Sequence, residues 1–462
     1  MTTREQAIAA AEGYLREGRF LTDLERRIAY RTESQRDDRD KILRSYLTEE
    51  MAPTLERLGF RTHLAENPVT PKVPLLLAER IEGQNLPTVL IYGHGDVLHG
   101  MESDWSDGLD PWGLKEENGR LYGRGTVDNK GQHSLNIAAI EVIIETRGKL
   151  GFNVKIVLEM GEEIGSPGLA EVCRTHSDLL AADVLIASDG PRLADTKPTL
   201  FLGARGARNF DLTCTLRKRA YHSGNWGGAL ADPAIILAHA IASITDASGR
   251  IRIPEWKPKD IPQLVRELVA ALELESAPAD PSIDPEWGEP GLSTPEKLFA
   301  WSSFAVLSMH SGRPEAPVNA ISGAATAHCQ LRFVVGVDGE RILPALREHL
   351  DNAGFSQVEI VPSKKGSFTP TRTAPDNPWV TLVRNSIKDS TGKTASILPN
   401  LGGSLPNEVF SEILGMPTVW IPHSHPSCAQ HAPDEHMLAD VMREGLVIMT
   451  GLFWDIGSFQ RQ

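Results

Sequence analysis

Five side chains that could bind metal ions lie along the sequence beside segments that resemble strands. They are His94, Asp128, Glu163, Asp189 and His431. Three carboxylates and two imidazoles match the ligands of two divalent ions that share one carboxylate, and Asp128 is the candidate bridge. Two Zn²⁺ ions would bring about four positive charges and the acids about three negative ones, which leaves room for a bound hydroxide. The set therefore predicts a dinuclear zinc site.

Hydrolysis is the chemistry that such a site would support. A bound Zn²⁺ lowers the pKa of water to about 7, so a hydroxide becomes available as the nucleophile near neutral pH. Glu162, beside Glu163, could act as the general base that takes the proton of this water and later delivers it to a leaving amine. Two adjacent carboxylates at a strand end repel each other unless a cation or a proton compensates their charge. The pair is therefore a stronger sign of a functional site than either acid alone.

Each of these residues also has a simpler explanation. His94 could be a strand-end histidine with an ordinary hydrogen bond, and Asp128 and Asp189 could be turn residues. The two glutamates could lie in a solvated turn. Asp96 follows His94 on the same face of an extended chain and could hold the second imidazole nitrogen. The whole ordered set is harder to explain as unrelated turns.

The stretch 423–436, HSHPSCAQHAPDEH, is dense in potential ligands. A local mononuclear site would consist of His423, His425, Cys428 and His431. The distant acids require only His431 from this stretch, so Cys428 needs no metal role. His423 or His425 could then contact the substrate or an adventitious ion.

The end of the same stretch predicts the start of a helix. Pro433, Asp434 and Glu435 precede the apolar periodic segment MLADVMREGLVIM, and proline and acidic residues favour the first turn of a helix. His436 lies past this start and is expected to be structural.

Short apolar runs, which predict strands, alternate with helical patterns around these residues. The runs are VPLLLAER, PTVLIYGHGD, NVKIVLEMGEE, ADVLIASDG and MPTVWIPHSH. Residues up to about 60 and the segment HSLNIAAIEVII have the apolar spacing of helices. Alternating strands and helices predict an α/β sheet with helices on its faces, and such sheets carry their functional loops at the strand ends.

The pattern changes between residues 205 and 368. ARNFDLTCTLRKR and GAATAHCQLRFVV alternate apolar and polar residues, which predicts a half-exposed sheet with helices on one side. We therefore expect an inserted domain at 205–368 between two parts of one catalytic domain, 1–204 and 369–462. Within the insert, APADPSIDPEWGEPG at 277–291 predicts a long surface loop.

Composition excludes several classes of protein. The chain has 462 residues, of which 41% are hydrophobic, so it is expected to be globular. Its formal net charge of -14 and pI near 5.5 argue against binding to nucleic acid. Its four cysteines lack CxxC spacing, which favours a reducing compartment. The first 20 residues are charged throughout and lack the apolar core of a signal peptide, and no uncharged apolar run reaches the roughly 18 to 20 residues of a spanning helix. These features predict a cytoplasmic protein with no membrane partner.

The motif order resembles the M20 family of dinuclear zinc peptidases and deacylases. The matching segments are GHGD, GRGTVDNKGQ, EMGEEIGSPG, SDG and HAPDEH. The family includes carnosinase-like dipeptidases, acetylornithine and succinyl-diaminopimelate deacylases, aminoacylases and glutamate carboxypeptidases. The resemblance implies an α/β, mixed-sheet zinc-peptidase catalytic domain with an inserted α+β lid that forms a dimer. It also implies that His94 and Asp189 bind one zinc ion, that Glu163 and His431 bind the other, and that Asp128 bridges them.

The resemblance implies roles for further residues. Asp96 would orient His94, Glu162 would be the general base, and His222 in YHSGNWGG would stabilise the oxyanion, in the partner's active site. The substrate-binding candidates are Asn319, Arg332, Gly403 and Ser404. Some of these assignments have alternatives. His222 could be a histidine on the surface of the lid, Arg332 could form an ordinary ion pair in its strand, and LGGSLP could be a plain tight loop.

One departure from the family pattern lies beside the candidate bridge. Many relatives carry another aspartate after Asp128, joined through a peptide bond that is often cis, whereas this sequence has Asn129. We expect the loop geometry to survive with one negative charge fewer.

These inferences predict a zinc-dependent hydrolase of a dipeptide or an N-acyl amino acid with a free carboxylate. Two Zn²⁺ ions per chain are expected, with Co²⁺ or Mn²⁺ as possible substitutes, and a homodimer through the lid. Two alternatives stay open. One is a catalytically inactive relative that binds metal or peptide, and the other is an N-carbamoyl amidohydrolase of the same family.

Overall fold

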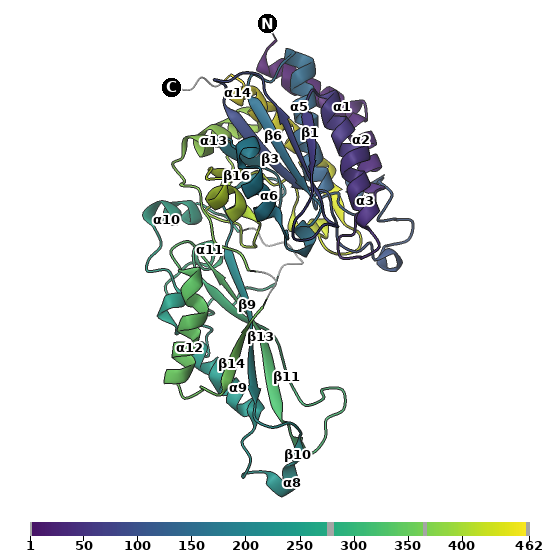
Figure 1. The fold of residues 1–462 in the computed structure, drawn as a ribbon. Helices are drawn as coiled ribbons and strands as arrows, with labels where there is room; N and C mark the ends of the chain where they lie inside the picture. Colours follow the sequence, from purple (N-terminus) through teal and green to yellow (C-terminus); the bar gives the residue numbers. More distant parts are fainter. Residues whose placement is uncertain (1, 275–280, 364–366, 459–462) are drawn as a thin grey trace.

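The computed structural model describes residues 2–274, 281–363 and 367–458, which form two lobes (Figure 1). The upper lobe in this view holds a large sheet covered by helices, and the lower lobe holds a smaller sheet. Residues 277–280 of the predicted surface loop lie outside the described residues. The rest of the loop, residues 281–291, contains no helix or strand. The domain boundaries at 204/205 and 368/369 stay a prediction.

The large sheet has eight strands in the order β1-β2-β6-β3-β7-β16-β8-β15. The strands are β1 (Arg61–Ala65), β2 (Leu75–Arg80), β3 (Thr88–His94), β6 (Asn153–Glu159), β7 (Val184–Ala187), β8 (Thr199–Phe201), β15 (Ser396–Leu398) and β16 (Thr418–Trp420). The four central strands, β6, β3, β7 and β16, run parallel, whereas β1 with β2, β2 with β6, and β16 with β8 pair antiparallel. All five predicted runs form strands here, and the predicted α/β class is confirmed.

Helices cover both faces of this sheet because its strands are apolar on both sides. In β3, Val89 and Ile91 join one buried cluster, while Leu90 and Tyr92 join the other. The first cluster is built with α1 (Arg4–Arg16), α2 (Arg19–Ile28), α3 (Asp40–Ser45), the π-helical turn η1 (Tyr46–Met51), α4 (Ala52–Arg57), α5 (Lys130–Arg147), α13 (Pro378–Thr391) and α14 (Ala439–Ile456). The second includes α6 (Leu169–Thr175), α7 (Ser177–Leu180), α10 (Gln263–Ala270), α11 (Thr294–Phe299) and the π-helical turn η6 (Val409–Ile413). Such continuous apolar runs are typical of parallel strands buried on both faces.

The lower lobe contains an antiparallel sheet in the order β11-β13-β9-β14. Its strands are β9 (Gly206–Thr215), β11 (Ser303–Ser311), β13 (Ala324–Phe333) and β14 (Val358–Pro362). The side chains of β13 alternate between half-buried and buried, and the buried ones pack with α9 (Pro233–Ile244), η4 (Pro254–Trp256) and α12 (Ile342–Asn352). This is the half-exposed sheet with helices on one side that the alternating pattern predicts. At its far end, β10 (Tyr221–His222) pairs with β12 (Ala320–Ile321) beside α8 (Ser223–Trp226) (Figure 1).

The predicted helix start at Pro433 is wrong. His436–Leu438 forms strand β17, which pairs with β5 (Arg120–Tyr122) in a small sheet with β4 (Lys115–Glu117). Helix α14 begins only at Ala439. Asp434 has a φ of 61°, which is the left-handed conformation and cannot continue a right-handed helical turn. The acidic pair after Pro433 therefore serves another purpose.

Two further observations bear on the class of protein. All four cysteines are buried and free. Within the described part of the chain, none of the helices combines the length and the apolar character that crossing a membrane requires.

Candidate metal centre

Three neighbouring parallel strands bring four of the predicted site residues to one edge of the large sheet. His94 is the last residue of β3. Glu162 and Glu163 lie in the short helix η3 (Glu162–Ile164), which follows β6, and Asp189 follows β7. Because β6, β3 and β7 are parallel and adjacent, their carboxyl ends meet at the same edge.

Two loops from other parts of the chain complete the centre. Asp128 precedes α5, and the Asp128–Asn129 peptide bond is cis. The Asn129 side chain donates a hydrogen bond to the main-chain oxygen of Ser188, with an N···O distance of 2.8 Å, so an amide suffices at this position. His431 lies in the loop before β17 with a φ of 63°, a conformation that non-glycine residues rarely adopt outside functional or tight-turn positions.

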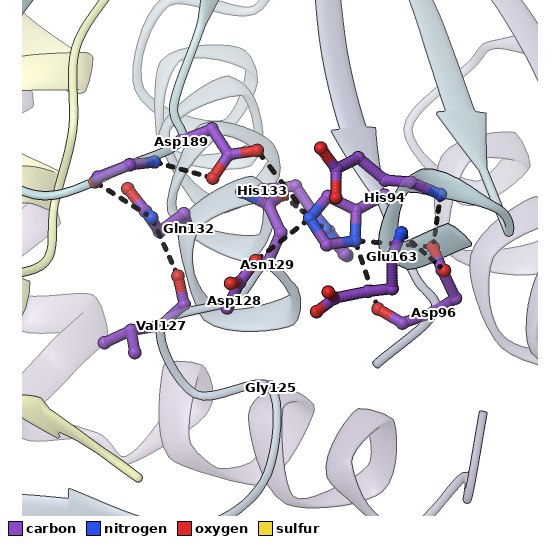
Figure 2. A network of polar contacts seen from close by, with 12 residues as sticks. His94, Asp96, Gly125, Val127, Asp128, Asn129, Gln132, His133, Glu163 and Asp189 are labelled. Carbon is purple, nitrogen blue, oxygen red and sulfur yellow. Dashed lines mark hydrogen bonds and ion pairs between the residues drawn. The ribbon is translucent and has the colours of Figure 1, made fainter. Parts of the chain in front are cut away.

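The five predicted ligands converge in two groups that share Asp128 (Figure 2 shows four of the five). One group is His94, Asp128 and Asp189, the other is Asp128, Glu163 and His431, and in each the ligand atoms lie within 4.8 Å of one another. Asp128 Oδ2 is 2.8 Å from His431 Nε2, and Asp128 Oδ1 is 3.1 Å from His94 Nε2. The two carboxylate oxygens of Asp128 thus face different histidines.

Buried atoms that lack hydrogen bonds show that this centre suits cations. His94 Nε2, Glu163 Oε1 and Asp189 Oδ2 are buried without a hydrogen bond of adequate geometry, although His94 Nε2 lies close to two carboxylates. Leaving such groups unpaired in the interior is costly. Nitrogen and carboxylate oxygen atoms in groups of three fit the ligand sets of divalent transition metals, zinc among them.

The electrostatics of the centre also indicate a site for cations. Burial and neighbouring acids raise the pKa values of Glu162 and Glu163 well above the ordinary range, and burial raises that of Asp189 to about 6. For Asp128, hydrogen bonds from His431 and His94 outweigh the effect of burial and lower the pKa. So many acids in one buried place require either protons or cations.

Removing metal should destabilise the chain, and more so at pH 7.5 than at pH 5. In the metal-free chain the folded pKa of Asp189 is raised from 3.8 to about 6, so the proton stabilises the folded state at low pH. That stabilisation, about 3 kcal/mol from Asp189 at most, is lost as the pH rises from about 4 through 6. Bound cations replace the protons. The difference in melting temperature between metal-loaded and chelator-treated chain should therefore grow with pH, and a difference that shrinks would contradict a metal role for these acids.

Asp96 contributes more than the sequence predicts. Its carboxylate lies 3.4 Å from His94 Nδ1, while the same nitrogen is 3.1 Å from the Asp96 main-chain oxygen. The two carboxylate oxygens also accept the backbone N–H groups of Glu162 and Glu163, at 3.2 and 3.1 Å. Asp96 thus holds the loop that carries both glutamates as well as the imidazole.

Glu435 is a residue that the sequence reasoning missed. Its Oε1 accepts the backbone N–H groups of Gly125, Val127 and Asp128 at 3.0 to 3.3 Å, and its Oε2 accepts Arg124 Nη1 at 2.7 Å. Both Glu435 and Arg124 are buried. The residue therefore fixes the loop of Asp128 against the segment that carries His431. Local sequence assigns Glu435 to a helix start, because PDE is a common first turn. No local sequence pattern predicts its contact with Arg124.

Replacing Glu435 with glutamine should lower the free energy of unfolding by about 3–5 kcal/mol, because it leaves the buried Arg124 guanidinium without its carboxylate. Adding Arg124→Met should recover much of the loss. The control is Asp440→Asn, which breaks the exposed Arg443–Asp440 pair and should cost less than about 1 kcal/mol. Urea unfolding measures all three, and an equally small effect at Glu435 would contradict its role in fixing the loop.

Gln132 links the remaining loops of the centre. Its amide nitrogen donates to the main-chain oxygens of Val127 and Gly190, at 2.7 and 3.4 Å, and its oxygen accepts the backbone N–H of His423 at 2.7 Å. Figure 2 shows Gln132 between Val127 and the Asp189 loop. One side chain of α5 thus ties together the segments that follow three different strands or turns.

The local mononuclear site at 423–431 does not form. The groups of three or more potential ligands found among the described residues are the two that share Asp128. His423 is completely buried, and burial lowers its pKa, which favours a structural role over contact with substrate. His425 instead accepts the backbone N–H of Ser427 at 3.2 Å, and Cys428 is buried.

The predicted lid residues fall into two places. Arg332, on β13, donates from Nη1 to Ser404 Oγ at 3.1 Å, so β13 and the loop containing Gly403 and Ser404 are in contact. His222 and Asn319 lie together at the far tip, where Asn319 accepts the backbone N–H of Ser223 at 2.9 Å. Figure 1 places this tip, with β10 and α8, at the opposite end of the molecule from the large sheet. Within one chain, His222 and Asn319 are therefore not brought to the metal centre.

Comparison with known proteins identifies relatives of this architecture. The sequence profile described as "Peptidase family M20/M25/M40" matches residues 90–455. A Beta-Ala-His dipeptidase of Rattus norvegicus is 31% identical over 307 residues, which are 64% of this chain and 60% of the rat protein. A Cysteinylglycine-S-conjugate dipeptidase of Corynebacterium striatum is 26% identical over 364 residues, 76% of each chain. The crystal structure of human carnosine dipeptidase 1 shares the fold, with a TM-score of 0.77, 24% identity and 99% of both chains covered.

Proposed function

The chain belongs to peptidase family M20/M25/M40, and we propose that it is a dipeptidase that uses two divalent metal ions to hydrolyse a dipeptide with a free carboxylate. The observation that carries this proposal is the pair of three-residue ligand groups that share Asp128. The names of the rat and Corynebacterium relatives support a dipeptide as the substrate.

In this proposal His94 and Asp189 would hold one ion, Glu163 and His431 would hold the other, and Asp128 would belong to both ligand groups. The two oxygens of Asp128 already face His94 and His431. Zinc ions in these positions would lower the pKa of water and polarise the scissile carbonyl. Co²⁺ or Mn²⁺ could take their places, because the ligand atoms suit these ions too.

Glu162 is the proposed general base. Its backbone N–H is held by Asp96 at 3.2 Å, and it belongs to the same set of interacting charges as His94, Asp189 and Asp128. Burial raises the pKa of Glu162, which makes its carboxylate a stronger proton acceptor. The carboxylate takes the proton of the attacking water and returns it to the amide nitrogen as the bond to the carbonyl carbon breaks.

Arg332 and Ser404 are the proposed binding site for the substrate's carboxylate. The Arg332 side chain is half-buried, and it pairs with no acid among the residues that the structure describes; its Nε and Nη1 atoms contact Gln330 and Ser404 instead. A guanidinium held in this way can bind a carboxylate through two parallel hydrogen bonds. Gly403, beside Ser404, leaves the adjacent backbone open to the ligand.

A substrate panel tests the proposed function. The metal-loaded chain should hydrolyse dipeptides such as β-alanyl-histidine and cysteinyl-glycine faster than N-acetyl, N-succinyl or N-carbamoyl amino acids with Zn²⁺, Mn²⁺ or Co²⁺. Hydrolysis of an N-acyl or N-carbamoyl series alone would replace the dipeptidase by a deacylase or an amidohydrolase. No turnover of any member would favour an inactive relative.

We also propose that two chains pair through the lower lobe. Strand β11 is an edge strand whose side chains are mostly exposed, among them Val306, Leu307 and Met309. Such an apolar edge favours pairing with another strand. Trp226 and Val318 expose further apolar surface near the tip. Pairing here would offer the tip residues His222 and Asn319 to the partner chain's metal centre, where His222 would stabilise the oxyanion.

Mixing two inactive variants tests this arrangement. His222→Ala and Glu162→Gln chains should each be nearly inactive, but co-expression should restore roughly a quarter of the wild-type activity. Half of the dimers are then mixed, and each mixed dimer has one centre with both Glu162 and a partner His222. Light scattering should report a dimer. A monomer, or a mixture no more active than its components, would contradict the role of His222 across the interface.

A further inference from the structure

A cavity of about 260 Å³ lies between the α11 segment and the four-stranded sheet. Its walls join the two lobes, because Trp301 packs against the core of the large sheet and Phe304 against the core of the lower lobe. Small-molecule sites occur preferentially at such junctions. The lining includes none of the proposed metal ligands.

The rim of this cavity is apolar and exposed. Ile283, Trp287 and Leu298 line it with exposed fractions of 59%, 58% and 42%. Three large apolar side chains exposed around one hollow are typical of a binding surface, since each would otherwise favour burial.

The exposed Trp287 is held firmly in place. Its indole lies so close to Gly249 that a Cβ there would be 2.5 Å from the ring. The Lys297 ammonium donates to the main-chain oxygens of Pro285 and Trp287, at 2.9 and 2.8 Å. A tryptophan that is fixed by its neighbours yet open to solvent is preorganised to contact a ligand.

The inner wall offers hydrogen-bond donors. Trp301 Nε1 and Ser302 Oγ are buried without a hydrogen-bond partner among the described residues. Beside them lies Arg205, only 8% exposed, whose Nε donates to the main-chain oxygen of Gly402 at 2.8 Å. Buried donors and a buried cation of this kind require an acceptor.

No acid of the protein supplies this acceptor to Arg205 within the described ranges. Burial and the nearby charge of Arg332 lower the pKa of Arg205 to about 10, which indicates an uncompensated cation. Asp284 and Glu289 also line the cavity; no ion pair joins Asp284 to Arg205, and the carboxylate of Glu289 pairs with Arg250 and Lys257, at 3.1 and 3.7 Å. An anionic group entering from solvent would therefore meet an unpaired guanidinium.

We propose that this cavity binds a small carboxylate that carries an aromatic or other apolar body. The carboxylate is held by the Arg205 guanidinium, the Ser302 hydroxyl and the Trp301 indole N–H. The apolar body packs between Trp287, Ile283 and Leu298. This ligand site is separate from the metal centre and goes beyond the proposed hydrolysis.

The site also adjoins the proposed substrate loop. Arg205 donates to Gly402, and its own main-chain oxygen accepts Ser404 Oγ at 2.9 Å, while Ser404 contacts Arg332. Arg205 is therefore one hydrogen bond from Ser404 and two from Arg332, the residues proposed to hold the substrate's carboxylate.

Fluorine NMR can locate the ligand directly. The metal-loaded full chain, labelled with 5-fluorotryptophan, is titrated with phenylacetate, and Trp287→Phe and Trp301→Phe assign the two resonances of the cavity. We expect saturable shifts of both, with no shift at Trp226, which is exposed at the tip of the lower lobe. The uncharged 2-phenylethanol should bind at least about tenfold more weakly. This comparison needs no altered protein.

Variants separate the cavity from the metal centre. Leu298→Asp should weaken phenylacetate binding at least about tenfold, whereas Ile235→Asp, at an exposed apolar position outside the cavity, should not. Arg332→Met should leave the Trp287 and Trp301 shifts unchanged. Unmoved resonances up to about 10 mM phenylacetate, equal affinity for the alcohol, or loss of the shifts in Arg332→Met would each overturn the proposal. None of these readouts depends on hydrolysis, so failure of the dipeptidase assignment would be seen separately.

Discussion

Glu162→Gln should lower kcat for dipeptide hydrolysis by about 10²–10⁴-fold while the chain keeps its metal ions. Glutamine has the size of glutamate but cannot accept the proton of the attacking water. The backbone N–H of residue 162 can still be held by Asp96, so the loop should keep its place. Steady-state kinetics together with metal analysis of the same sample measures both effects.

A matched control makes this result specific. Glu171→Gln makes the same chemical change at a half-exposed position on α6, and it should leave kcat within about twofold of wild type. Retained turnover in Glu162→Gln would remove Glu162 from the role of base. Loss of metal along with activity would instead make it a ligand or a structural residue.

Asp128→Asn should lose both metal ions and at least about 10³-fold in activity, because this residue contributes to both ligand groups. Asparagine keeps the shape of the side chain but carries no negative charge to offset the two cations. Metal content after dialysis, measured by mass spectrometry, should fall well below the two ions per chain that the ligand groups imply.

The neighbouring aspartate provides the comparison. Asp189 belongs to only one of the two groups, so Asp189→Asn should lose about one ion and keep the other. His423→Ala removes a buried imidazole outside both groups and should change stability rather than metal content. Equal metal loss in Asp128→Asn and Asp189→Asn would contradict the shared position of Asp128.

The sequence predicts the large sheet, and the convergence of the candidate metal ligands at its edge, for a physical reason. Apolar runs such as PTVLIYGHGD and NVKIVLEMGEE form central strands, and parallel strands necessarily bring their carboxyl ends to one edge. His94, Glu163 and Asp189 are therefore fixed in space by a pattern that is local in sequence. Asp128 and His431 lie close to these three residues as well. For these two, the order of the motifs along the chain predicts the shared site.

Residues that act across long separations in sequence could not be read from local patterns. Glu435 was assigned to a helix, yet it accepts hydrogen bonds from the loop of Asp128, more than 300 positions earlier. The histidine-rich stretch before His431 leaves a contact with substrate or an adventitious ion open for His423 or His425, but His423 packs in the interior. In both cases the tertiary partner, and not the local propensity, decides the role.

The position of His222 illustrates a different limit. Its motif predicts a catalytic role, but strand β10, which contains His222, lies at the tip of the lower lobe, apart from the large sheet of its own chain. A single sequence contains no pattern that distinguishes action within one chain from action between two. The exposed strand β11 indicates an interface only after the fold has placed it at an edge.

X-ray anomalous scattering at the zinc edge, from crystals of the zinc-loaded chain, tests the central claim most directly. The proposal predicts two peaks, one among His94, Asp128 and Asp189 and one among Asp128, Glu163 and His431, with Asp128 contacting both. A single peak at either group, a peak in the stretch 423–428, or two peaks that do not share Asp128 would contradict the proposed dinuclear centre.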